Sequence, residues 1–393
     1  MIDVLVCVRA EDAVLEFLSV LSREPRDEAV VLLADPALTV TLPSGTGTAG
    51  RLALLAPHVR PAEDPPRSRP GGHDVAARIR KAAAGREVLV WTHSPADNRE
   101  ARARLGRDTA RAAHGLPVRH AVGYSPYLQV VSDEDVPLTP ELVAIKREFV
   151  NLHCSALFSS DSPQYRVDTS RVPASERFFR SRPDEAVRLY ALLASLGEDA
   201  AEVDDPWEFA ASPYERARLD TTLAWIGRHC PAGTAPLVEV GACEGALTRR
   251  LLAAGHQVHA TEPNDRFRRR LSTALAGVER LAVSAAGLKE LADGAGPRGP
   301  HLLIEMLYYG QDPALIDRLP ADLVLLALEP EALRTTLRPW LAASPHWEVA
   351  EETVLVAPRV EAVCGGRAYL TKRGSHGLLL RRTGPAAPTA ASR

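Results

Sequence analysis

Lysine is almost missing from this chain, and cysteine and aromatic residues are scarce. Only four of its 47 basic residues are lysines, which we attribute to the composition of the source rather than to function. The five cysteines are odd in number and scattered, with no Cys-x-x-Cys pair and no Cys/His cluster. We therefore expect neither a disulfide framework nor a metal site.

A strong net charge and a long apolar run are missing as well. The formal charge is −3 and the pI is near 6.5, whereas a protein that binds nucleic acid needs a basic face. No apolar run approaches the length that spans a bilayer, and the first residues lack the basic leader of a signal peptide. These absences predict a soluble, cytoplasmic protein with no nucleic-acid or membrane partner.

What the chain does have is an alternation of short apolar runs with amphipathic helical periods. Strands are expected over residues 4–8, 30–33 and 88–91, with a helix between the first two. Such alternation predicts α/β domains with parallel strands, and 393 residues suit two of them. The expected ranges are an α/β domain over 1–157, a helical linker over 158–203, a second α/β domain over 204–382 and a disordered tail over 383–393.

The most informative stretch is residues 237–245. An apolar run suited to a buried strand leads into Glu-x-Gly-x-x-x-Gly, formed by Glu239, Gly241 and Gly245, and a helical period follows. Glycine in such a turn lets the backbone pass close to a ligand, and the helix N-terminus offers free N–H groups. Glu262 ends a second apolar run, where an acidic side chain can accept hydrogen bonds from both hydroxyls of a ribose. The stretch predicts a nucleotide site, with an ordinary strand-to-helix turn as the alternative.

The spacing of the glycines favours one kind of nucleotide ligand. A dinucleotide site would read Gly-x-Gly-x-x-Gly, and the middle glycine is missing here. The motif resembles instead the first motif of class I S-adenosylmethionine-dependent methyltransferases. The resemblance implies an enzyme with a Rossmann-like domain on a mostly parallel seven-stranded sheet, with S-adenosylmethionine as cofactor and S-adenosylhomocysteine as product. The cofactor-binding residues that it implies are Glu239, Gly241, Ala242, Cys243, Gly245, Glu262, Ser284 and Glu305.

One position departs from that family. Many members carry an acidic residue near the adenine after the third strand, and this chain has Val283-Ser284-Ala285 in that region. The Ser284 hydroxyl can still make one hydrogen bond. The adenine contact is therefore an open point of the resemblance.

Two flanking motifs narrow the family further. Asp204-Asp205-Pro206-Trp207 precedes the glycine turn, and Glu305-x-x-Tyr308-Tyr309 follows the fourth expected strand. Together they resemble the nodulation-factor N-methyltransferases, which methylate the free amine of a deacetylated chitin oligosaccharide, over residues 204–382. The resemblance implies Glu305, Tyr308 and Tyr309 as catalytic residues and Asp205, Trp207 and Tyr214 as substrate-binding residues. The alternatives are that the two tyrosines pack the strand end, that Asp205 caps a helix and that Trp207 is an anchor.

In the first half, the first expected strand ends in Val8-Arg9-Ala10-Glu11-Asp12. This layout resembles the N-acetylglucosaminyl-phosphatidylinositol deacetylase-like family, whose first turn reads Ala-His-Pro-Asp-Asp-Glu. In that comparison Arg9 replaces a zinc-binding histidine and Glu11 replaces the base, while Asp12 keeps one ligand. The second metal histidine corresponds to Ala101. Zinc hydrolases need three protein ligands, so the resemblance implies a deacetylase-like scaffold without its metal. Its expected role is to shape the acceptor pocket or to mediate homo-oligomerisation.

These observations favour a methyltransferase that moves a methyl group to the nitrogen of an amino sugar or of a sugar-containing natural product. The expected partner is thus a small-molecule acceptor such as an amino sugar or glycoside. Three alternatives stay open. They are O-methylation of a sugar or polyketide hydroxyl, a bifunctional deacetylase–methyltransferase, and a non-catalytic binding protein that keeps the nucleotide fold.

Overall fold

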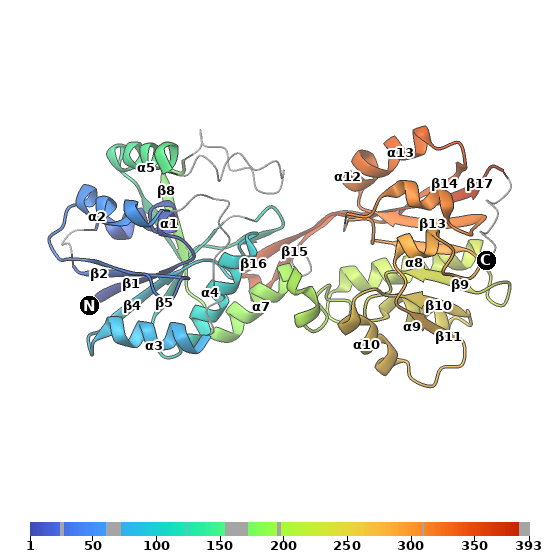
Figure 1. Cartoon of the computed structure of the whole chain (residues 1–393), viewed down its shortest axis with the longest axis horizontal. Coiled ribbons are helices and arrows are strands. Elements are labelled where there is room, and N and C mark those ends of the chain that lie inside the picture. Colours follow the sequence, from blue (N-terminus) through green and yellow to red (C-terminus); the bar gives the residue numbers. More distant parts are fainter. Residues whose placement is uncertain are drawn as a thin grey trace. The chain divides into compact units, whose positions relative to one another are not determined.

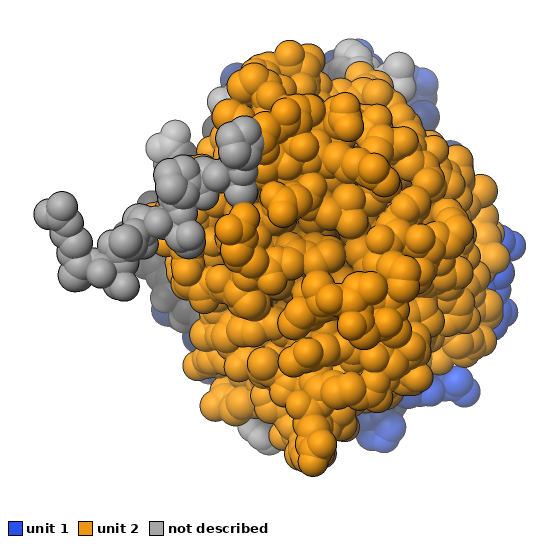
Figure 2. All heavy atoms as spheres, turned by 90° about the vertical axis from the view of Figure 1, so that its right-hand side faces the viewer, with its two compact units in different colours: residues 1–198, 361–370 blue, residues 199–360, 371–393 orange. Residues whose placement is uncertain are grey.

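The computed structural model divides the chain into two compact units (Figure 1, Figure 2). Unit 1 comprises residues 1–198 and 361–370, and unit 2 comprises residues 199–360 and 371–393. The residues that the structure describes are 1–23, 27–59, 72–123, 125–153, 172–194, 198–308 and 310–384. Most of the tail expected over 383–393 therefore lies outside the described residues. No helix in the described ranges is long and apolar enough to cross a membrane.

Unit 2 is built on a seven-stranded, mostly parallel sheet, which confirms the expected α/β architecture. Its strands are β9 (Leu237–Val240), β10 (Val258–Thr261), β11 (Leu281–Ser284), β12 (His301–Ile304), β13 (Leu323–Leu328), β14 (Trp347–Val356) and β17 (Ser375–Arg382). The order across the sheet is β11-β10-β9-β12-β13-β17-β14, and β17 alone runs opposite to the other strands, antiparallel to both β13 and β14. The order reverses between β9 and β12, where α/β sheets bind their ligands.

Helices cover both faces of this sheet (Figure 1). They are α8 (Pro213–His229), α9 (Ala246–Ala253), α10 (Asp265–Ala274), α11 (Leu288–Ala292), η5 (Pro313–Arg318), α12 (Pro330–Ala332), η6 (Leu333–Leu337) and α13 (Arg338–Ala343). Successive strand residues point to opposite faces, so Leu302 packs with α8, α9 and α10 while Leu303 packs with α11, η5 and η6. The nearly continuous apolar runs in the sequence reflect burial on both faces.

Unit 1 holds a second seven-stranded sheet, of order β3-β2-β1-β4-β5-β8-β7. Its strands are β1 (Ile2–Cys7), β2 (Ala29–Leu33), β3 (Thr39–Leu42), β4 (Val88–Thr92), β5 (Val118–Ala121), β7 (Glu134–Pro137) and β8 (Ser175–Phe179). The four central strands run parallel, and antiparallel strands flank them. Its helices are α1 (Ala10–Leu21), α2 (Thr48–Leu55), η1 (Ala56–His58), α3 (Gly72–Ala83), α4 (Glu100–Ala112), α5 (Pro140–His153) and α7 (Pro183–Ala194).

The range expected as a helical linker, 158–203, contains a strand of this sheet. In β8, Phe178 and Phe179 are fully buried, and the Glu176 carboxylate accepts hydrogen bonds from the backbone N–H of Leu18 and Ser19. The Lys146 ammonium lies 2.6 Å from the same carboxylate and neutralises it. A buried glutamate whose partners are distant in the sequence produces no local hydrophobic pattern. The polar sequence around β8 therefore predicts a turn-rich linker instead of a strand.

The segment 361–370 is a second difference from the sequence prediction, which puts it inside a continuous domain over 204–382. After β15 (Arg359–Val363) and η7 (Cys364–Gly366), β16 (Ala368–Lys372) pairs antiparallel with β6 (Leu128–Val130). The buried side chains of Ala368 and Leu370 join a cluster of unit 1. The chain therefore enters unit 2 near residue 199, returns to unit 1 at 361 and enters unit 2 again at 371.

Candidate functional site

The turn after β9 has the backbone that its glycines predict. Gly241 and Gly245 have φ of +72° and +80°, in the left-handed region that favours glycine. The N–H groups of Gly241 and Ala242 both donate to the carbonyl of Thr261, at 2.9 Å, which ties the turn to the end of β10. Cys243 also has a positive φ, +49°, and burial raises the pKa of its thiol. The turn is thus a fixed loop at the carboxyl edge of the sheet.

Glu262 directly follows β10, at the end of the second strand, and its carboxylate reaches the glycine turn. One oxygen accepts the N–H of Cys243 and the other the N–H of Asn264, each at 2.8 Å. The residue is only 5% exposed, and burial raises its pKa. Each carboxylate oxygen has a second lone pair, so the group can still accept the hydroxyls of a ribose.

Glu239 faces the protein rather than an opening. It is buried, and one carboxylate oxygen lies 2.6 Å from the Thr248 hydroxyl, which donates to it from α9. Burial raises the pKa of Glu239 to about 7, and the nearby Glu262 adds to the effect. Its contact with Thr248 joins the strand to the helix on either side of the glycine turn.

The segment after β12 brings Glu305 and Tyr308 beside that turn. A side chain added at Gly241 would meet the Cβ of Met306 at 3.3 Å, so the two loops touch. One carboxylate oxygen of Glu305 accepts the Ser375 hydroxyl at 2.5 Å, and the other accepts the Tyr308 hydroxyl. Tyr308 in turn accepts the N–H of Glu329 at 2.6 Å. Tyr309 lies outside the described residues.

Tyr308 is held as a neutral phenol. Burial raises its pKa far above the ordinary value, and the Glu305 carboxylate raises it further by charge repulsion and by accepting the hydrogen bond. A phenol in this state cannot take a proton from a nucleophile at neutral pH. Its contacts suit it to orient Glu305.

Unit 2 also contains a network of ion pairs that no sequence motif predicts. Arg218 of α8 is 2.8 Å from Glu215, and Lys372 is 3.0 Å from the other oxygen of Glu215. Arg373 pairs with Glu329 at 2.5 Å. The Lys372–Glu215 pair joins residues 157 positions apart. Its only sequence signal is that Lys372 is one of just four lysines.

The predicted substrate-binding residues do not share an open surface. Both carboxylate oxygens of Asp205 accept backbone N–H groups, those of Phe209 and Ala210, at 2.7 and 2.9 Å. Tyr214 is 3% exposed and accepts the N–H of Gly374, and burial raises its pKa to about 12. Asp205 therefore caps a turn that precedes α8 rather than a helix, and Tyr214 packs against the segment before β17.

Trp207 and Ser284 are only partly buried. The Trp207 ring packs against Phe209 and Phe267, with ring centroids 5.9 and 5.2 Å apart. Ser284 ends β11, and its hydroxyl lies 3.0 Å from the Nε2 atom of His259. Of the predicted residues, Glu262 contacts the glycine turn at Cys243, and Glu305 lies next to Met306, which packs against Gly241.

Unit 1 has its own charged cluster at the matching edge of its sheet. Arg102 pairs with Asp12 and, at 2.7 Å, with Glu16, while His93 lies 2.6 Å from Glu16 and 3.3 Å from Asp12. Although burial opposes ionisation, the guanidinium holds the pKa of Asp12 below its usual range. Within the described ranges, no three His, Cys, Asp or Glu side chains form a group that could hold a metal ion. Arg102 supplies the positive charge that balances these carboxylates.

Comparison with known proteins gives likenesses of fold. No protein-family model matches the chain, and no curated protein matches its sequence. Among solved structures, it is similar to the N-methyltransferase NodS from Bradyrhizobium japonicum WM9 in complex with S-adenosylhomocysteine, at 15% identity over 49% of this chain and 100% of that one, with a TM-score of 0.37.

Two further solved structures are similar to a comparable share of the chain. Magnesium protoporphyrin IX methyltransferase from Synechocystis PCC 6803, with bound S-adenosylmethionine, matches at 16% identity over 51% of this chain and 97% of that one, with a TM-score of 0.36. The N-terminal domain of EvdMO1, with S-adenosylhomocysteine bound, matches at 18% identity over 46% and 84%, with a TM-score of 0.31. Likenesses this remote assign no activity, which must rest on the residues of this chain.

Proposed function

We propose that this protein is an S-adenosylmethionine-dependent methyltransferase that N-methylates an amino sugar or a sugar-containing natural product. One observation carries the proposal. The left-handed glycine turn, the Glu262 carboxylate and the Glu305 segment meet at the carboxyl edge of β9, β10 and β12, beside the point where the strand order reverses.

The residues of this edge fit the cofactor. A Cβ at Gly241 would meet the Cβ of Met306 at 3.3 Å, so the glycine lets the turn and the segment after β12 pack closely together. Glu262 would hold the ribose hydroxyls through its remaining lone pairs, and the turn from Gly241 to Gly245 would hold the methionine part. The chemistry that this cofactor supplies when bound is a methyl group on a sulfonium.

The chain's own contribution is to orient the acceptor and to take its proton. An amine attacks only in its neutral form, and in this proposal the Glu305 carboxylate receives the proton that the amine sheds. Tyr308 and Ser375 donate to the two oxygens of Glu305 and so fix the direction of that carboxylate. Alignment of the nucleophile with the methyl group removes entropy from the barrier.

The proposal is tested by calorimetric titration with S-adenosylhomocysteine and by transfer of a labelled methyl group to a panel of amino sugars. Glu262→Ala is expected to weaken binding by at least about tenfold, because it removes hydrogen bonds to a charged acceptor. Glu305→Gln should keep that binding and lose transfer. Glu279→Ala, which changes an exposed carboxylate before β11, is the control. Unchanged affinity in Glu262→Ala would overturn the site assignment.

A further inference from the structure

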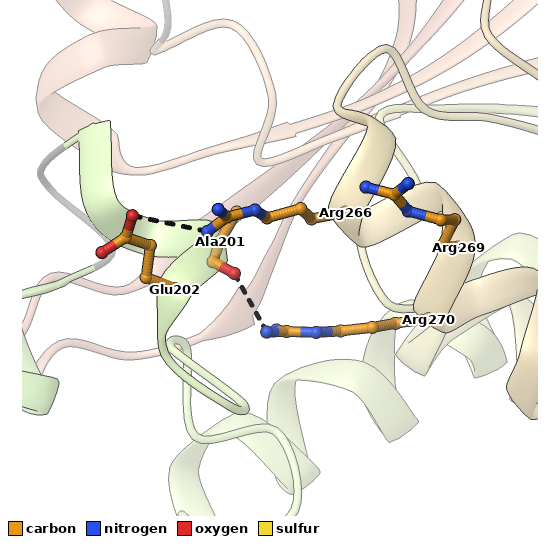
Figure 3. A pocket seen from close by; sticks show the side chains of 5 residues that line it. All are labelled: Ala201, Glu202, Arg266, Arg269 and Arg270. Atoms are coloured by element: carbon orange, nitrogen blue, oxygen red, sulfur yellow. Dashed lines mark hydrogen bonds and ion pairs between the residues drawn. The ribbon is translucent and has the colours of Figure 1, made fainter.

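An open pocket of about 500 Å³ lies in unit 2 between η4 (Glu198–Glu202) and α10 (Figure 3). The described residues that line it are Ala201, Glu202, Arg266, Arg269 and Arg270. The three arginines occur at positions i, i+3 and i+4 of α10, so they share one face of the helix. No residue predicted from the sequence to bind cofactor or substrate lines this pocket.

The positive charge that the pocket can offer a ligand comes from Arg266 and Arg269. The lining holds three guanidinium groups and one carboxylate, but Arg270 is already paired with Glu244 and Asp204, which lie outside the lining. The carboxylate, Glu202, is 3.4 Å from Arg266, and both side chains are more than half exposed. Such an exposed pair is weak and can open for a stronger anion. Arg269 is exposed and forms no hydrogen bond or ion pair with the described residues.

The side chain of Arg270 is held in place by several contacts. Its guanidinium donates to the carbonyl oxygen of Ala201 at 2.9 Å (Figure 3). It also donates to the carbonyl oxygen of Val203 at 2.9 Å, and it pairs with Glu244 at 2.5 Å and with Asp204 at 3.4 Å. Glu244 belongs to the glycine turn, between Cys243 and Gly245. The pocket is therefore anchored directly to the loop that we propose to hold the cofactor.

We propose that this arginine pocket binds the phosphate group of a small phosphorylated molecule. Guanidinium groups bind phosphate oxygens through two parallel N–H donors, and a phosphate monoester carries a charge close to −2. Arg269 and Arg266 can turn to such an anion, since Arg266 has only its exposed pair with Glu202 to give up. The pocket is also much larger than a free ion, which favours a phosphate carried on a larger molecule. That this molecule is the methyl acceptor rests on the proposed function, whereas phosphate binding itself does not.

The test titrates the full chain, at constant ionic strength, with inorganic phosphate, glucosamine 6-phosphate and glucosamine. Both phosphate compounds are expected to bind, the sugar phosphate more tightly, and glucosamine is not. Arg269→Ala should weaken phosphate binding by about tenfold through the loss of one charged pair. Glu202→Gln should strengthen it by about threefold, because a competing carboxylate is removed.

Arg249→Ala is the matched control, since it removes an equally exposed arginine from α9 outside the pocket. An equal loss in Arg249→Ala and Arg269→Ala would overturn the inference, because it would report net charge alone. Equal affinity for the two phosphate compounds would support the site and assign it to the free ion.

S-adenosylhomocysteine is titrated into the same samples. If it binds while neither phosphate compound does, this inference fails and the proposed function stands.

Discussion

The two buried carboxylates at the glycine turn differ in their hydrogen-bond partners. Glu262 accepts two backbone N–H groups, whereas Glu239 is buried with one hydroxyl partner. The pKa of Glu239 is raised from 4.5 to about 7, so the folded state keeps a proton that the unfolded chain releases. Between these two values the unfolded state binds fewer protons, and stability therefore falls as the pH rises.

The fall in stability with rising pH can be tested with Glu239→Gln. The amide keeps an acceptor for Thr248 and cannot ionise, so the variant should be more stable than the parent at pH 8, by up to about 3 kcal/mol. At pH 4.5 the two proteins should differ little in this contribution. Urea unfolding at both pH values measures the difference, and a gap that does not change with pH would refute the buried, protonated carboxyl.

Packing between elements decides which glycines can be replaced. In β17, a side chain at Gly377 would meet three ring atoms of Trp225 at 3.1–3.2 Å, and Trp225 is fully buried on α8. We expect Gly377→Ala to lower the free energy of unfolding by about 1–3 kcal/mol, since the ring must shift.

Gly227 provides the opposite case on the same helix. It is exposed, and an added Cβ would meet nothing within 4 Å. Gly227→Ala should therefore raise the free energy of unfolding by about 0.5–1 kcal/mol, because alanine suits a helix better. Thermal unfolding of both variants measures the two shifts, and a stabilising Gly377→Ala would show that α8 and β17 are less tightly packed than described.

Contacts within unit 2 show which features of the site can be predicted from the sequence. The glycine turn and Glu262 could be predicted because strand, turn and helix follow one another locally. The partners of Glu305 could not, since Ser375 is 70 positions away and arrives on an antiparallel strand. The structural use of Asp205 was open for a similar reason, because its two backbone partners depend on a left-handed φ of +48° that no spacing indicates.

At the scale of the whole molecule, residues 361–370 belong to unit 1 although their flanks belong to unit 2. On β16, Leu370 is 6% exposed within a cluster of unit 1, and its neighbour Tyr369 is 45% exposed. Leu370→Ala should lower the free energy of unfolding by about 2–5 kcal/mol, whereas Tyr369→Ala should change it by less than about 0.5 kcal/mol. Denaturant unfolding of the pair measures this, and equal effects would contradict the pairing of β16 with β6.

The double return of the chain also limits how this protein can be divided. A single cut near residue 198 would leave both units joined through the segment 361–370. A gene fragment for 1–198 would keep only β6 of the three-stranded sheet β15-β16-β6, and a fragment for 204–382 would carry β15 and β16 without β6. Neither unit is therefore a continuous stretch of sequence that could be expressed or transplanted alone. Separating them would require a new connection in place of residues 361–370.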